Sequence, residues 1–109
     1  MTSLSEVQAA QALNEIASLA SQISGLLMGI AFSTPQTEAD DLIEKQGALG
    51  QAFRESAKCF RMDISGQERL RHVREILRCP TVEYTKVVRR DHPPSPVLSL
   101  MERMSTLVS

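Results

Sequence analysis

The stretch LNEIASLASQISGLLMGI, residues 13–30, carries apolar residues at alternating spacings of three and four. This spacing is a seven-residue repeat, which places its members on one face of an α-helix or in the seam of a coiled coil. The repeat comprises Leu13, Ile16, Ala20, Ile23, Leu27 and Ile30. We therefore predict a long amphipathic first helix whose leucine and isoleucine face is buried.

The same stretch contains Gly25 and Gly29, which are spaced as in helix pairs that pack closely inside membranes. A helix that faces lipid is apolar all round, but this helix places Gln11, Asn14 and Ser18 together opposite the leucine face. No Lys or Arg flanks the apolar run as a membrane anchor would. We therefore predict no membrane span. The small residues form a second face, which either receives another helix or faces water.

A second helix is predicted after residue 33. Its expected apolar face comprises Ala39, Leu42, Ile43, Leu49, Phe53, Ala57 and Phe60. Gly47 and Gly50 each weaken a helix by about 1 kcal/mol relative to Ala, yet we predict that the helix continues through them. A third helix is predicted to begin at a capping box of Ser65 and Glu68. Pro80 is predicted to end it, because proline lacks the N–H that a helix needs.

The pattern changes after Pro80. Residues 81–88, TVEYTKVV, are β-branched and predict extended chain or a short strand. The proline-rich RRDHPPSP follows, and a last short helix begins with Ser95 as cap and Pro96 in the first turn. We expect the connector to hold this helix away from the core. The helix then docks on a partner or beside Gly25 and Gly29, or it is a frayed tail.

Together these patterns predict an all-α fold of three main helices with a short fourth helix after residue 95. The expected organisation is a helical bundle over residues 1–80, an extended connector over 81–95 and a short amphipathic helix over 96–109. At 109 residues the chain has room for one domain with an aliphatic core.

Charge is distributed unevenly along the chain. Residues 1–44 contain no Lys or Arg, whereas residues 45–109 carry all 12 basic residues. Such an asymmetry indicates either a surface for an acidic partner in the second half or attraction between the two halves. The chain has two cysteines, too few for a disulfide framework, and its N-terminus lacks the basic region of a secretory signal. We therefore predict a cytoplasmic protein in a reducing environment.

Catalysis has no support in the sequence. There is no glycine-rich phosphate loop and no nucleophile or metalloprotease motif. Cys59, His72, Cys79 and His92 lack the close pairs that most zinc sites use. We predict no enzyme activity, no catalytic residue, no cofactor and no metal site.

These observations predict a helical protein–protein interaction module: an adaptor, an oligomer subunit or a small chaperone-like protein. The predicted partner-binding residues are Leu13, Ile16, Ile23, Gly25, Leu27, Gly29, Ile30, Leu100, Met101 and Met104. The alternative is a nucleic-acid-binding regulator that holds phosphate through its arginine-rich third helix. The candidate anion-binding residues are Arg69, Arg71, Arg74 and Arg78.

Overall fold

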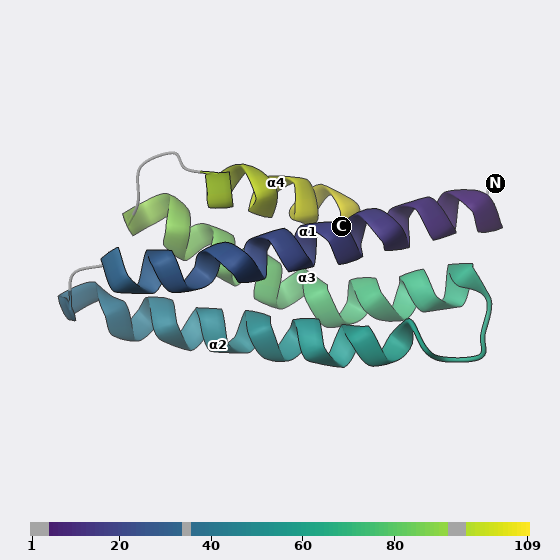
Figure 1. Ribbon diagram of the computed structural model, residues 1–109, viewed down its shortest axis with the longest axis horizontal. Coiled ribbons are helices and arrows are strands. Elements are labelled where there is room, and N and C mark those ends of the chain that lie inside the picture. Colours follow the sequence, from purple (N-terminus) through teal and green to yellow (C-terminus); the bar gives the residue numbers. More distant parts are fainter. Residues whose placement is uncertain (1–4, 34–35, 92–95) are drawn as a thin grey trace.

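The computed structural model describes residues 5–33, 36–91 and 96–109, and it describes their side chains except at 28–33, 36–39 and 91 (Figure 1). These residues form four helices and no strand, so the predicted all-α fold is confirmed. The helices are α1 (Glu6–Ser33), α2 (Gln36–Cys59), α3 (Gly66–Asp91) and α4 (Pro96–Val108). None of them, over the residues described, is both long and apolar enough to cross a membrane.

The four helices lie side by side in an elongated body of 46 × 23 × 20 Å (Figure 1). Helices α1 and α3 run in one direction, and α2 and α4 run in the other. Helix α3 packs against all three other helices, with α2 along one side of it and α4 along another. The core therefore forms around α3, and every other helix contributes its apolar face to it.

Helix α1 buries the predicted heptad face. Leu13, Ile16, Ile23 and Leu27 are buried, and Ala20 is half-buried. The side chain of Ile30 lies outside the described residues. The helix begins at a reciprocal capping box in which the Gln8 backbone N donates to Ser5 Oγ (3.1 Å) and the Ser5 backbone N donates to Gln8 Oε1 (3.1 Å).

Helix α2 is continuous through Gly47 and Gly50, as predicted. Its buried face differs from the predicted one. Ile43 is 54% exposed and Ala57 is exposed, whereas Ala52, Ser56 and Cys59 are buried beside Leu42 and Leu49. The face is rotated because the helix packs mainly on α3, and that contact selects the positions that turn inward.

The prediction that Pro80 ends the third helix is wrong. Helix α3 continues through Pro80 to Asp91, so residues 81–91 are helical and form neither a strand nor an extended connector. The ribbon of α3 changes direction near its middle (Figure 1). Such a bend is the usual consequence of a proline inside a helix, which removes one backbone hydrogen bond and crowds the preceding turn.

Burial explains why α3 survives its proline. Leu77, Thr81, Tyr84 and Val88 are all fully or almost fully buried, and their spacings of four, three and four continue one helical face across the proline. The helix propensities of Val and Thr fall short of that of Ala by less than about 1 kcal/mol per residue. Packing of this face against the other helices outweighs that deficit.

The N-terminus of α3 is capped twice. The Ser65 Oγ accepts a hydrogen bond from the Glu68 backbone N at 3.2 Å, as the predicted capping box requires. The carboxylate of Glu6, on the first turn of α1, accepts further bonds from the backbone N of Gly66 (2.8 Å) and of Gln67 (3.2 Å). A Cβ at Gly66 would lie 2.9 Å from Glu6 Oε2, so the glycine admits this close approach. The negative charge also suits the positive end of the helix dipole.

Helix α4 packs into the core instead of being held away from it by the connector, so that expectation is wrong. Val97, Met101, Met104 and Val108 are buried against α1 and α3. Helix α4 does not dock beside Gly25. A Cβ placed on this glycine would have no neighbouring atom within 4 Å, so the space beside it is open. The predicted cap Ser95 lies outside the described residues, but Pro96 is the first helical residue, as predicted.

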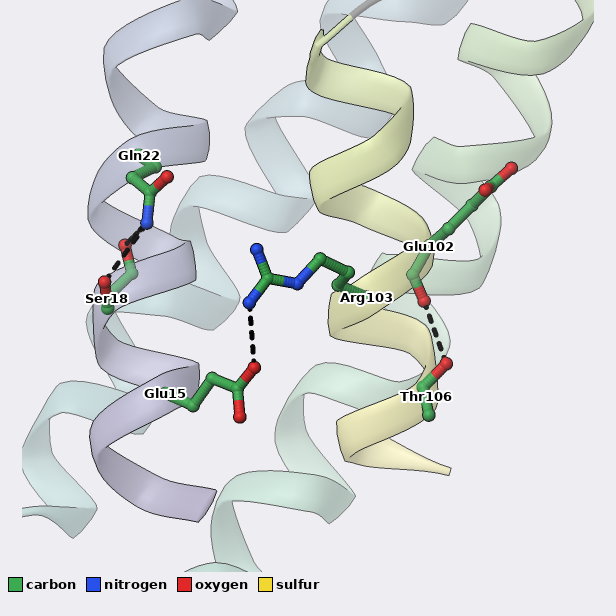
Figure 2. Close-up of polar contacts among 6 residues, drawn as sticks. All are labelled: Glu15, Ser18, Gln22, Glu102, Arg103 and Thr106. Carbon is green, nitrogen blue, oxygen red and sulfur yellow. Dashed lines mark hydrogen bonds and ion pairs between the residues drawn. The ribbon is translucent and has the colours of Figure 1, made fainter. Parts of the chain in front are cut away.

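Ion pairs at the edges of α4 join it to both neighbours. Arg103 Nη2 lies 2.9 Å from Glu15 Oε1 on α1 (Figure 2), and Arg89 Nη2 on α3 lies 3.1 Å from Glu102 Oε1. Both pairs are solvent-exposed, and such pairs contribute about 0–1 kcal/mol each. They orient α4, while its buried methionines and valines supply the packing energy.

The single tyrosine of the chain, Tyr84, is fully buried on α3. Its hydroxyl has no hydrogen-bond partner among the described residues. Burial disfavours the charged phenolate and raises the pKa of Tyr84 from 10.0 to about 12. The folded state therefore retains the phenolic proton over a pH range in which the unfolded chain loses it.

We expect this proton to make the fold sensitive to alkali. Because the folded pKa is the higher one, the stability linked to Tyr84 is complete below pH 10 and is lost as the pH rises towards 12. Near pH 11, one unit above the ordinary tyrosine pKa, the free energy of unfolding should have fallen by about 1.4 kcal/mol. Urea unfolding of wild type and of Tyr84→Phe between neutral and alkaline pH measures this loss, since the two chains differ only in the phenolic hydroxyl. An absorbance titration that shows an ordinary tyrosine pKa would contradict the prediction.

Candidate interaction groove

A groove lies on the surface of α3 where it meets the end of α4, and its volume is about 380 Å³. The residues that line it are Gln67, Leu70, Arg71, Arg74, Glu75, Arg78 and Ser109. All but Ser109 belong to α3, on its N-terminal half before Pro80. The groove thus joins a row of arginines to a buried leucine, Leu70, and to the last residue of the sequence.

Two of these arginines hold the C-terminus of α4. Arg74 Nε donates to the Leu107 carbonyl oxygen at 2.9 Å, and Arg78 Nε donates to the Val108 carbonyl oxygen at 3.0 Å. The last carbonyls of a helix have no partner within the helix, and they carry the negative end of its dipole. Both guanidinium groups therefore stabilise the end of α4 and are themselves fixed in position by it.

Neither guanidinium forms an ion pair with a carboxylate of the described residues. Each bond to α4 uses only the Nε–H, and an arginine has further N–H donors on its two terminal nitrogens. Arg74 is half-buried and Arg78 is exposed, and both line the groove. The groove therefore carries two positive charges that form no ion pair in the described part of the chain, with the carboxylate of Glu75 lining the same groove.

The other two predicted anion-binding arginines are engaged differently. Arg71 lines the groove but pairs with Glu68, with Nη2 at 2.6 Å from Oε2, and this pair replaces the Arg71–Glu75 pair that the spacing also allows. Arg69 is not among the groove residues, and its Nε donates to the Met62 carbonyl at 2.9 Å in the α2–α3 loop. The structure thus brings Arg71, Arg74 and Arg78 together and separates Arg69 from them.

Most of the predicted partner-binding residues lie inside the chain. Leu13, Ile16, Ile23, Leu27, Met101 and Met104 are buried by the chain's own helices, and Leu100 is half-buried. A partner would reach the buried ones only if the helices separated. Gly25 is exposed on the polar side of α1, and the Gly29 and Ile30 side-chain positions lie outside the described residues.

The candidate metal and catalytic side chains are dispersed. No three His, Cys, Asp or Glu side chains gather as metal ligands in the part of the chain that the structure describes. Cys59 is buried on α2, whereas Cys79 is exposed on α3. His72 is half-buried, and His92 lies outside the described residues.

Comparison with known proteins gives no relative. No family model matches the chain, and neither a curated protein nor a solved structure is significantly similar to it.

Sequence reasoning missed what encloses the groove. Gln67, Leu70, Glu75 and Ser109 were not among the predicted site residues, although Leu70 and Glu75 neighbour Arg71 and Arg74 on one helix. The spacing of Arg74 and Arg78, four residues apart, places them one above the other on a helix. This spacing predicts that the two arginines lie together. It does not predict that α4 lies beside them, because that depends on how the helices pack.

Proposed function

We propose that this chain is a non-catalytic helical interaction module that binds a partner protein. The observation that carries the proposal is the groove at the α3–α4 junction, in which Arg74 and Arg78 lack a carboxylate partner among the described residues. Two arginines that form no ion pair beside a concave surface favour binding of an anionic group. The groove lies on packed helices, which hold a binding site more accurately than a loop does.

The architecture supports the same reading. The chain covers its own heptad face with α3 and α4, and an adaptor of this kind presents the outer surfaces of its helices. An oligomer remains part of the proposal, since a second copy of the chain is itself a protein partner. The small-residue side of α1, around Gly25, offers a second exposed helix face.

Nucleic-acid binding is the second candidate function, and the gathering of Arg71, Arg74 and Arg78 in one groove favours it. A protein that binds DNA through its phosphates typically contacts about 6–10 of them, and its affinity then falls steeply with salt. The groove supplies fewer charges, because Arg71 already pairs with Glu68 and because Glu75 also lines the surface. The protein-binding module is therefore the stronger proposal.

The proposal predicts that the immobilised chain retains a partner protein, from a lysate of its own source, in a saturable manner. Retention should survive nuclease treatment, and it should be absent from a column of the Ile23→Asp variant, whose core is disrupted. Mass spectrometry identifies the retained protein, and titration with the purified partner measures the stoichiometry.

Two results would reject the module reading. The first is retention that nuclease abolishes, which would assign the groove to nucleic acid. The second is equal retention by the folded and the disrupted chain, because binding to an unfolded chain reports exposed apolar surface and no defined site.

A further inference from the structure

We propose that the groove at the α3–α4 junction binds a short acidic segment of a protein partner, with Arg74 and Arg78 as the receptors for its carboxylates. This inference rests on the proposed interaction function and names the site and the class of partner. These two guanidinium groups form no ion pair within the described part of the chain, and both line one concave surface of about 380 Å³.

The donors are held ready before any ligand arrives. The bonds from Arg74 Nε to Leu107 and from Arg78 Nε to Val108 fix the plane of each guanidinium group. A carboxylate pairs best with an arginine through two parallel N–H···O bonds, which require a defined plane. Because α4 already restricts the arginine rotamers, these side chains lose less conformational entropy when a ligand binds.

The surroundings of the two arginines favour a peptide. Leu70, which is 2% exposed, lies at the base of the groove and offers a small apolar contact next to the acidic side chains of a ligand. Glu75 lines the same groove, and its negative charge limits the affinity for any anion. A long polyanion would be repelled by both Glu68 and Glu75. A short segment can place its carboxylates on Arg74 and Arg78 alone.

The experiment uses the full chain and a phage-displayed library of random peptides. Selection on wild type should enrich peptides with two or more Asp or Glu residues beside an aliphatic residue. The strongest of these peptides, labelled with fluorescein, is then titrated with wild type and variants and followed by fluorescence polarisation. A single-stranded oligothymidine of similar length serves as the nucleic-acid probe.

Substitutions on α3 separate the groove from the rest of the helix. Arg74→Gln with Arg78→Gln should weaken peptide binding by about tenfold or more, because the charged hydrogen bonds to the peptide carboxylates are lost. Arg89→Gln is the matched control, since it removes the same charge from α3 at a distance from the groove, where Arg89 pairs with Glu102. This control should leave the peptide affinity unchanged.

Glu75→Gln provides a test that structural damage cannot imitate. Removal of this exposed like charge should make peptide binding about two- to fivefold tighter. The thermal unfolding midpoint of every variant is measured, so that loss of the α4 cap in the arginine double variant is distinguished from loss of the ligand contact.

The inference is overturned if the selected peptides carry no acidic preference, or if the arginine double variant and Arg89→Gln bind them equally. It is also overturned if oligothymidine binds more tightly than the peptides and depends on Arg74 and Arg78. A partner protein that still binds the arginine double variant would refute the groove as the binding site, but it would leave the proposed interaction function standing.

Discussion

Removal of residues 96–109 is expected to unfold the remaining chain at room temperature. The deletion takes away Val97, Met101, Met104 and Val108, all of which are buried. Burial of a side chain of this size contributes about 1.5–3 kcal/mol, so the loss amounts to roughly 6–12 kcal/mol. The total stability of a small domain is about 5–15 kcal/mol. The loss is comparable to the whole stability of such a domain, so we expect the truncated chain to unfold.

The exposed core reinforces this expectation. Without α4, the buried faces of α1 and α3 meet water, and Arg74 and Arg78 lose the carbonyls that they cap. Circular dichroism and thermal unfolding of the truncated chain measure the effect. Deletion of the exposed Ser109 alone is the matched control and should leave the unfolding midpoint unchanged.

Addition of a synthetic peptide of residues 96–109 to the truncated chain should restore cooperative unfolding, because the same contacts can form between two molecules. A truncated chain with the helical signal and unfolding midpoint of the full chain would contradict the packing of α4. In that case the C-terminal segment would be a tail.

Replacement of Ile23 by aspartate is expected to abolish the fold as well. Ile23 is completely buried at the centre of the heptad face. The substitution removes an apolar side chain, worth about 2–5 kcal/mol when a core isoleucine is truncated, and introduces a charge. A buried charge without a partner costs several kcal/mol more. Together these costs approach the whole stability of a domain of this size.

Ser24→Asp is the control for Ile23→Asp. Ser24 is the next residue on α1 and is exposed, so it places the same charge on the same helix without disturbing the core. Far-UV circular dichroism should show a helical protein for Ser24→Asp and a largely unfolded chain for Ile23→Asp. Equal unfolding midpoints for the two variants would show that the heptad face lies outside the core.

The groove was predictable in part. The sequence indicates the arginines of the third helix as candidate anion ligands, and three of the four line one surface. Their bonds to Leu107 and Val108 join residues about 30 positions apart in the chain. Helical periodicity orders the residues of one helix but contains no information on which turn of another helix will lie beside them.

Spacing along the chain, by itself, determined the helical class and the buried face of α1. Leu13, Ile16, Ile23 and Leu27 repeat with the period of a helix, so they must share one face wherever that helix is placed. The Ser65–Glu68 cap and the position of Pro96 at the start of α4 are equally local, because each depends on neighbouring residues only.

The tertiary structure alone decided the course of α3 and the place of α4. Local rules end a helix at Pro80 and extend the β-branched residues after it, but Thr81, Tyr84 and Val88 gain burial only if the helix continues. Likewise, the proline-rich connector favours separation of α4, whereas Met101 and Met104 leave water only by packing on α1 and α3. In both segments, burial between distant parts of the chain outweighs local preferences of about 1 kcal/mol per residue.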